Sequence, residues 1–273
     1  MRCVYINLAQ ALERRESLEK NFYSLAPDNW SIERFNAIDK DFVFETKTSG
    51  KLRPGAKACF MSHAKVIRES KNADGHILIL EDDAQFGPSS FSVIDSFIRE
   101  DSHPQWDILF TDVGIPSPSV MIDLLKARRE LEKKKKCIAM DLAALTFYGS
   151  TAYIINEKSK DKIIGMLDQE LVFDTAYDMW LRKEIWGKRI NAYALFPFAT
   201  TVSLSANNSS IQPQDENLTD TVWNLYRRFM WVDRSLGGDS ELIDKLEAAH
   251  LDAESGELGS LLSLICSPNF KIK

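Results

Sequence analysis

Three consecutive carboxylates, Glu81, Asp82 and Asp83, directly follow the apolar run 76–80. Adjacent acidic side chains repel one another unless a cation lies between them. If the backbone stays extended, Glu81 and Asp83 point one way and Asp82 the other, because side chains alternate along a strand. Two carboxylates on one side suit Mg²⁺ or Mn²⁺, with diphosphate oxygens completing the coordination shell. The alternative interpretation is a solvated acidic turn.

A basic segment precedes the predicted helix 58–70 and could bind phosphates together with the helix N-terminus. Its cationic side chains are those of Lys47, Lys51, Arg53 and Lys57. The glycine spacing of this segment is that of a P-loop. However, Ala56 stands where the lysine belongs and no Ser or Thr follows Lys57, so we reject that motif. A solvated basic loop is the alternative.

A second acidic pair, Asp174 and Asp178, is spaced i,i+4 in a predicted helix over 174–186, so both would share one face. One of them could act as a general base. Spacing alone favours a structural interpretation, in which Asp174 caps the helix and Asp178 pairs with Arg182. His63, next to Ser62, is by itself typical of a structural histidine, and no Ser/His/Asp order or nucleophile elbow indicates a hydrolase.

Short apolar runs alternate with helical patterns, which indicates an α/β fold with a mostly parallel central sheet. The predicted strands are 3–8, 31–38, 76–80, 106–110, 143–156 and 190–196, and the predicted helices are 11–25, 58–70, 119–136, 158–167 and 174–186. Segment 39–54 is predicted to be a loop. The acidic triplet then lies beyond the carboxyl end of a strand, where open α/β sheets bind ligands.

The 273 residues are 44% hydrophobic and 27% charged, as in a soluble globular protein. The net charge of −6 argues against a nucleic-acid partner. Four scattered cysteines predict free thiols in a reducing compartment, and no apolar stretch is long enough to be a signal peptide core or a membrane span. We therefore expect a cytoplasmic protein, either free or peripheral at the inner face of the membrane.

The composition changes in the last quarter of the chain. Segment 203–217 is rich in Ser, Asn, Gln and Pro, which predicts a flexible loop that could close over a ligand, and a helical pattern follows. We predict a catalytic domain over 1–218 and a helical C-terminal extension over 219–273. The mixture of aromatic residues and arginines at 223–231 could form a helix on a membrane surface. Packing against the main domain is the alternative.

Several segments in the same order resemble glycosyltransferase family 25, the lipooligosaccharide and lipopolysaccharide galactosyltransferase type. Segments 4–8 and 35–39 resemble its opening strand and its F-x-A-[IV]-D segment, 54–63 is similar to its G-x-x-G-C-x-x-SH block, and 78–83 matches its hhhEDD strand and acidic triplet. Segments 106–109 and 149–154 and the helix containing Asp178 follow in the family's order. Two departures are Ala9 and Gln10, which stand where the family usually has Asp-Arg.

The resemblance implies a GT-A-like, Rossmann-type fold that binds a nucleotide-sugar, usually UDP-galactose, with Mn²⁺ or Mg²⁺ at the acidic triplet. Carried over by position, Glu81 and Asp83 serve the metal and Asp178 is the best candidate base, with Asp174 and Asp112 behind it. The donor-binding residues would be Asn7, Asp39, Lys57, Ser62, His63, Glu81 and Asp82.

The expected reaction is sugar transfer to a hydroxyl of a surface glycan or glycolipid, with inversion at the anomeric carbon. The alternative is a non-catalytic module of the same fold that binds a sugar or a protein.

Overall fold

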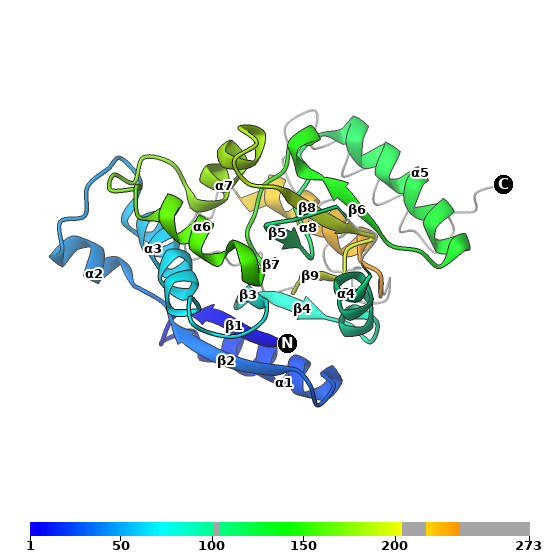
Figure 1. Cartoon of the computed structure of the whole chain (residues 1–273), viewed down its shortest axis with the longest axis horizontal. Helices are drawn as coiled ribbons and strands as arrows, with labels where there is room; N and C mark the ends of the chain where they lie inside the picture. The colour runs from blue at the N-terminus through cyan, green and yellow to red at the C-terminus, as the bar shows by residue number, and fades with distance from the viewer. Residues whose placement is uncertain (101–103, 204–216, 235–273) are drawn as a thin grey trace.

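The computed structural model describes residues 1–100, 104–203 and 217–234 (Figure 1). A seven-stranded sheet has the order β2-β1-β3-β7-β5-β8-β6. These strands are β2 (Ser31–Asn36), β1 (Arg2–Asn7), β3 (Ile77–Glu81), β7 (Ala152–Ile155), β5 (Ile108–Phe110), β8 (Ala192–Phe196) and β6 (Ile138–Asp141). Strand β1 runs parallel to β2 and β3, and β5 runs parallel to β8, whereas β7 and β6 are antiparallel to their neighbours. The predicted mostly parallel α/β sheet is thus confirmed.

Helices cover both faces of this sheet. They are α1 (Leu12–Leu25), α2 (Lys40–Glu45), α3 (Pro54–Glu69), α4 (Ser90–Arg99), α5 (Pro118–Lys134), α6 (Lys160–Leu167), α7 (Tyr177–Trp186) and α8 (Asn217–Met230). Side chains alternate along β3, so Leu78 and Leu80 pack with α1 and α4 while Ile77 and Ile79 belong to the core under α3, α6, α7 and α8. A small second sheet pairs β4 (Ala84–Phe86) with β9 (Thr200–Val202).

Three local predictions differ from the structure. Segment 39–54 contains α2, which begins where the Asp39 carboxylate accepts a hydrogen bond from the Phe42 amide (2.9 Å). Strand β6 was not expected, and only 152–155 of the long predicted strand 143–156 is extended. Helix α7 begins at Tyr177 rather than at Asp174.

Helix α8 belongs to the core of the main sheet. Its side chains Leu225, Tyr226, Phe229 and Met230 pack in the same cluster as β5 and β8, and residues 225–231 are buried. The residues that suggested a membrane-surface helix therefore pack against the protein, as in the alternative interpretation. Of the predicted extension 219–273, the part after 234 lies outside the described residues, as does almost all of loop 203–217.

The predictions of free thiols and of no membrane span can be compared with the structure only for the described residues. Cys3, Cys59 and Cys137 are free thiols, whereas Cys266 lies outside the described residues. Within the described ranges, no helix combines the length and the apolar character that crossing a membrane requires.

Candidate active site

A cavity of about 650 Å³ lies at the carboxyl ends of β1 and β3. Its walls come from the start of α1, the segment after β2, helix α3 and two residues of the acidic triplet, Glu81 and Asp82, whereas Asp83 does not line it. The lining residues include Gln10, Arg14, Asp39, Lys40, Cys59, Ser62, His63, Glu81 and Asp82. Four segments far apart in the sequence thus meet at the edge of the sheet where α/β folds bind ligands. We call this cavity the cleft.

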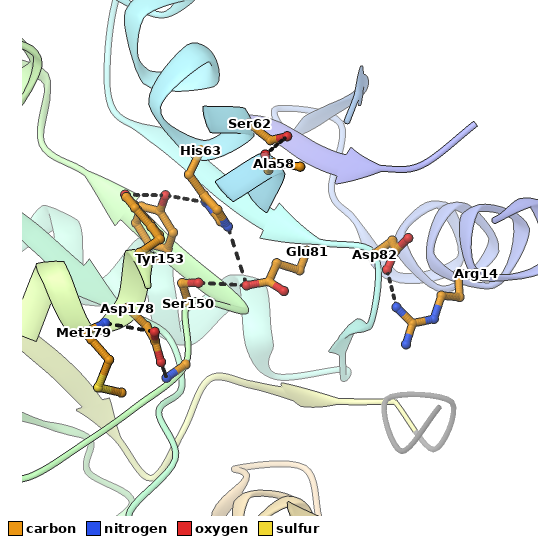
Figure 2. A network of polar contacts seen from close by, with 12 residues as sticks. Arg14, Ala58, Ser62, His63, Glu81, Asp82, Ser150, Tyr153, Asp178 and Met179 are labelled. Carbon is orange, nitrogen blue, oxygen red and sulfur yellow. Dashed lines mark hydrogen bonds and ion pairs between the residues drawn. The ribbon is translucent and has the colours of Figure 1, made fainter. Parts of the chain in front are cut away.

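Glu81 is held on one side of the triplet. Its Oε1 accepts a hydrogen bond from Ser150 Oγ (2.8 Å), and His63 Nε2 lies 3.5 Å from the same oxygen (Figure 2). Burial raises the pKa of Glu81, but His63 and Ser150 outweigh burial, so the net shift is downward. This carboxylate is therefore ionised at neutral pH.

His63 is fixed in its orientation by aromatic neighbours. Its Nδ1 is 2.8 Å from the hydroxyl of Tyr153, which in turn is 2.9 Å from the hydroxyl of Tyr177. The imidazole also stacks on Tyr177 with ring centroids 4.4 Å apart. His63 is fully buried, and these contacts aim its Nε2 at Glu81.

Strand β3 ends at Glu81 and residues 82–83 form a turn, in which Asp82 points away from Glu81 and toward Arg14 (Figure 2). Arg14 Nη1 lies 2.7 Å from its Oδ1, and Asn7 Nδ2 donates to its Oδ2 at 2.8 Å. Asn7 is buried and holds Asp82 without lining the cleft. Arg14 was missed from the sequence. Its signal in the sequence is its place in the first turn of α1, four residues after Gln10.

Asp83 differs from Glu81 and Asp82 in the hydrogen bonding of its carboxylate. Its Oδ1 is buried and, among the described residues, meets no hydrogen-bond donor. Burial and the charge of Glu81 raise the pKa of Asp83 to about 7, against the opposing charges of Arg14 and Arg227. A cation beside this oxygen would relieve both the burial and the repulsion.

The other predicted donor-binding residues divide into two groups. Ser62 lines the cleft and fixes its wall, since its Oγ accepts from the Ile38 amide (2.9 Å) and donates to the Ala58 carbonyl (2.7 Å). Asp39 also lines the cleft while capping α2. Lys57 does not line the cleft, because its ammonium group donates to the Thr48 carbonyl (2.7 Å).

Asp178 lies in the first turn of α7, close to Glu81. Its Oδ2 accepts from the amide of Gly149 (3.0 Å) and its Oδ1 from the amide of Met179 (2.8 Å). Ser150, the residue after Gly149, holds Glu81. One turn of the chain therefore connects the acidic triplet to the candidate base (Figure 2).

The expected helical pair of Asp174 and Asp178 is wrong. Asp174 precedes α7, is exposed, and accepts from the Lys51 amide (2.7 Å), so it stabilises a contact between two loops. Arg182 donates to the Phe147 carbonyl (3.1 Å) instead of pairing with Asp178. Of the two aspartates, only Asp178 lies beside the triplet.

Asp112 follows β5 and is almost fully buried. Its Oδ2 pairs with the guanidinium of Arg227 on α8, and its Oδ1 accepts from Thr200 Oγ1 (3.2 Å). Both oxygens of the buried Asp112 are therefore engaged in an ion pair and a hydrogen bond. Its role as a further candidate base stays a prediction.

Known proteins that resemble this chain in sequence or structure complement the geometry of the site. Two similar solved structures are the apo-form glycosyltransferase GlyE of Streptococcus pneumoniae TIGR4 (TM-score 0.38, 9% identity) and mouse xyloside xylosyltransferase 1 in its apo form (TM-score 0.34, 10% identity). Each alignment covers 70% of this chain, but only 44% and 63% of the respective structure, so the chain spans less than two thirds of either one. No curated protein matches the sequence. The family profile of Glycosyltransferase family 25 (LPS biosynthesis protein) matches residues 1–181, more than half of the chain. The chain therefore belongs to glycosyltransferase family 25.

Proposed function

We propose that this protein transfers a sugar, galactose, from a UDP-sugar to a hydroxyl of a lipopolysaccharide or another surface glycan, with inversion and with a divalent metal ion. The observation behind this proposal is the cleft, in which Glu81 and Asp82 meet Asp39, Ser62 and His63 at the carboxyl ends of the strands. Its volume, about 650 Å³, is in the usual range for small-molecule sites.

The carboxylates fit Mn²⁺ or Mg²⁺ when the donor contributes further oxygens. Among the described residues no hydrogen-bond donor meets the buried Asp83 Oδ1, and Glu81 lies close enough for its charge to raise the pKa of Asp83. Mg²⁺ is usually bound through one or two carboxylates together with substrate phosphates. Within the described ranges, no three His, Cys, Asp or Glu side chains are arranged to hold a metal ion, so the proposed site needs the oxygens of the donor.

Each side chain of the site has a role in this proposal. Asp83 and Glu81 would hold the ion, which when bound stabilises negative charge on the diphosphate. Asp82 orients Arg14 on the cleft wall, where a guanidinium can bind a phosphate. The segment around Asp39, fixed by Ser62, forms the wall for the nucleoside.

Asp178 is our candidate for the base. The acceptor oxygen would form a bond to the anomeric carbon, the bond from that carbon to the diphosphate oxygen would break, and Asp178 would take the hydroxyl proton. Two backbone amides fix its carboxylate, and the turn 149–150 sets its position relative to Glu81. Proton transfer to a positioned base is worth about 10²–10⁴-fold in rate.

A panel of nucleotide-sugars tests the proposal without knowledge of the acceptor. We expect slow hydrolysis of UDP-galactose with Mn²⁺, no hydrolysis with EDTA, and a loss of activity in Asp83→Ala. Equal hydrolysis of every nucleotide-sugar would contradict the donor assignment, and undiminished turnover by Asp83→Ala would contradict the metal assignment. A lack of both hydrolysis and metal-dependent UDP binding would favour a non-catalytic module.

A further inference from the structure

We propose that Arg227 is a positioning residue of the active site, which fixes the turn 148–150 and through it the carboxylates of Glu81 and Asp178. Helix α8 would then be part of the catalytic unit, although it follows the family-matched residues 1–181. The catalytic meaning of this inference rests on the proposed function, whereas its structural part can be tested without catalysis.

Arg227 reaches the site from the far end of the described chain. Its guanidinium is buried, with 4% of the side chain exposed, and both Nε and Nη2 donate to Asp112 Oδ2. Asp112 follows β5, so this ion pair ties α8 to the carboxyl end of the sheet. Two hydrogen bonds to a buried carboxylate hold the guanidinium in one orientation.

The remaining guanidinium nitrogen faces the turn. A Cβ built on Gly149 would lie 3.9 Å from Arg227 Nη1, in ordinary van der Waals contact. Gly149 has a φ of +86°, a conformation that L side chains rarely adopt. Glycine suits this conformation, and because it has no side chain the guanidinium of Arg227 lies beside the turn.

A second residue of α8 supports the same turn. Trp223 is one helical turn before Arg227 and so lies on the same face of the helix. Its ring packs on Tyr148 with centroids 4.6 Å apart. Gly114, which follows β5, also lies against Tyr148, because a Cβ on Gly114 would come within 2.0 Å of the ring. Residues 148–149 thus contact both helix α8 and the segment after β5.

Hydrogen bonds from this turn orient both candidate catalytic carboxylates. The Gly149 amide donates to Asp178 Oδ2 (3.0 Å) and Ser150 Oγ donates to Glu81 Oε1 (2.8 Å). A shift of the turn would therefore move the metal-side carboxylate and the base together. Misplacement by about 1 Å can cost on the order of 100-fold in rate.

General docking of α8 is the competing explanation, and the chain offers a matched control for it. Arg128 on α5 is also buried and donates to the Phe229 carbonyl of α8 (2.6 Å), and none of its described contacts is with residues 148–150. Arg128→Met should therefore remove one docking contact of α8 and lower stability while the Asp112–Arg227 pair stays in place. Removing Arg227 alone would leave Asp112 as an unpaired buried charge, so the informative variant is Asp112→Asn/Arg227→Met.

Hydrogen exchange and kinetics on the full chain test the inference. In Asp112→Asn/Arg227→Met we expect the peptide around 148–152 to exchange roughly tenfold faster. We also expect kcat for UDP-sugar turnover to fall roughly 10–100-fold. Arg128→Met should leave both unchanged and lower only the melting temperature. Arg227→Lys, which keeps the charge but not the planar fork, should show an intermediate loss of kcat.

Two results would overturn the inference: unchanged exchange at 148–152 in Asp112→Asn/Arg227→Met, or an equal change in Arg128→Met. If the wild-type protein proves inactive on every nucleotide-sugar, the proposed function fails. The exchange measurement still decides whether Arg227 positions the turn.

Discussion

Glu81, Asp82 and Asp83 are neighbours in sequence, yet each carboxylate has different partners. Glu81 meets His63 and Ser150, Asp82 meets Arg14 and Asn7, and Asp83 keeps an oxygen with no donor among the described residues. The separation of Glu81 from Asp82 was predicted on the condition of an extended backbone, whereas β3 ends at Glu81 and a turn separates the two side chains. The identity of the partners could not be predicted, because Arg14 and Ser150 are brought to the triplet only by the tertiary fold.

Asp83→Asn should change stability in a pH-dependent way without metal. The pKa of Asp83 is raised from 3.8 to about 7, so ionising this group in the folded protein is unfavourable. Wild-type stability should therefore fall as the pH rises between these two values, and Asn avoids that loss. We expect Asp83→Asn to melt above wild type at pH 8 and close to it at pH 4. Thermal melts across this range check the prediction, and a difference independent of pH would contradict it.

Asp178→Asn should lower the transfer rate by about 10²–10⁴-fold, because an amide cannot take the acceptor proton. UDP binding should stay close to wild type, since the expected donor site lies around the triplet. Asp174→Asn is the matched control, because Asp174 is exposed and bonds only the Lys51 amide among the contacts described. Steady-state kinetics of both variants give the comparison. Similar losses in the two would exclude Asp178 as the specific base.

At the scale of secondary-structure elements, the site depends on short connecting segments. The hydrophobic periodicity of the sequence does not predict such segments. The strand, helix and acidic-triplet patterns predicted β1, β3 and α3 correctly, and these elements supply part of the cleft, while α1, α2 and connecting segments supply the rest. Helix α2 was missed because its six residues are too short for a periodic signal, although Asp39 is a good cap. The turn 148–150 was predicted as strand, because its apolar flanks look extended and its constraints come from α8 and Gly114.

Gly114→Ala should damage this turn. The new Cβ would overlap the ring of Tyr148, so the side chain must move, at a cost of about 1–3 kcal/mol in unfolding free energy and with reduced activity. Gly165→Ala in α6 is the matched control, because nothing lies within 4 Å of its added Cβ. Alanine there should stabilise the helix by up to about 1 kcal/mol. Denaturant melts and activity assays separate the two, and a neutral Gly114→Ala would show that Tyr148 is free to shift.

At the scale of the whole molecule, α8 and the sheet share one core. The sequence predicted a helical extension over 219–273, and its described part packs in the same cluster as β5 and β8. An amphipathic pattern predicts which face of a helix is buried, but it does not predict the surface against which that face packs. For this reason the sequence left membrane contact and internal packing open, and only the tertiary structure decided for residues 225–231.

Phe229→Ala should destabilise the whole protein by about 3–5 kcal/mol in a single cooperative transition, since this buried ring belongs to the common core. Tyr23→Ala, whose ring is 69% exposed, should cost far less. Unfolding followed by both near- and far-ultraviolet circular dichroism checks this. Two separate transitions in Phe229→Ala would instead indicate that α8 unfolds on its own.

The central claim is that the acidic triplet binds a metal ion together with the diphosphate of a nucleotide donor. An anomalous difference map from crystals grown with Mn²⁺ and UDP tests it most directly. We predict one strong manganese peak beside Asp83 and Glu81, with the nucleotide in the cleft between Arg14 and Asp39. A manganese peak at another place, or UDP bound outside the cleft, would contradict the account.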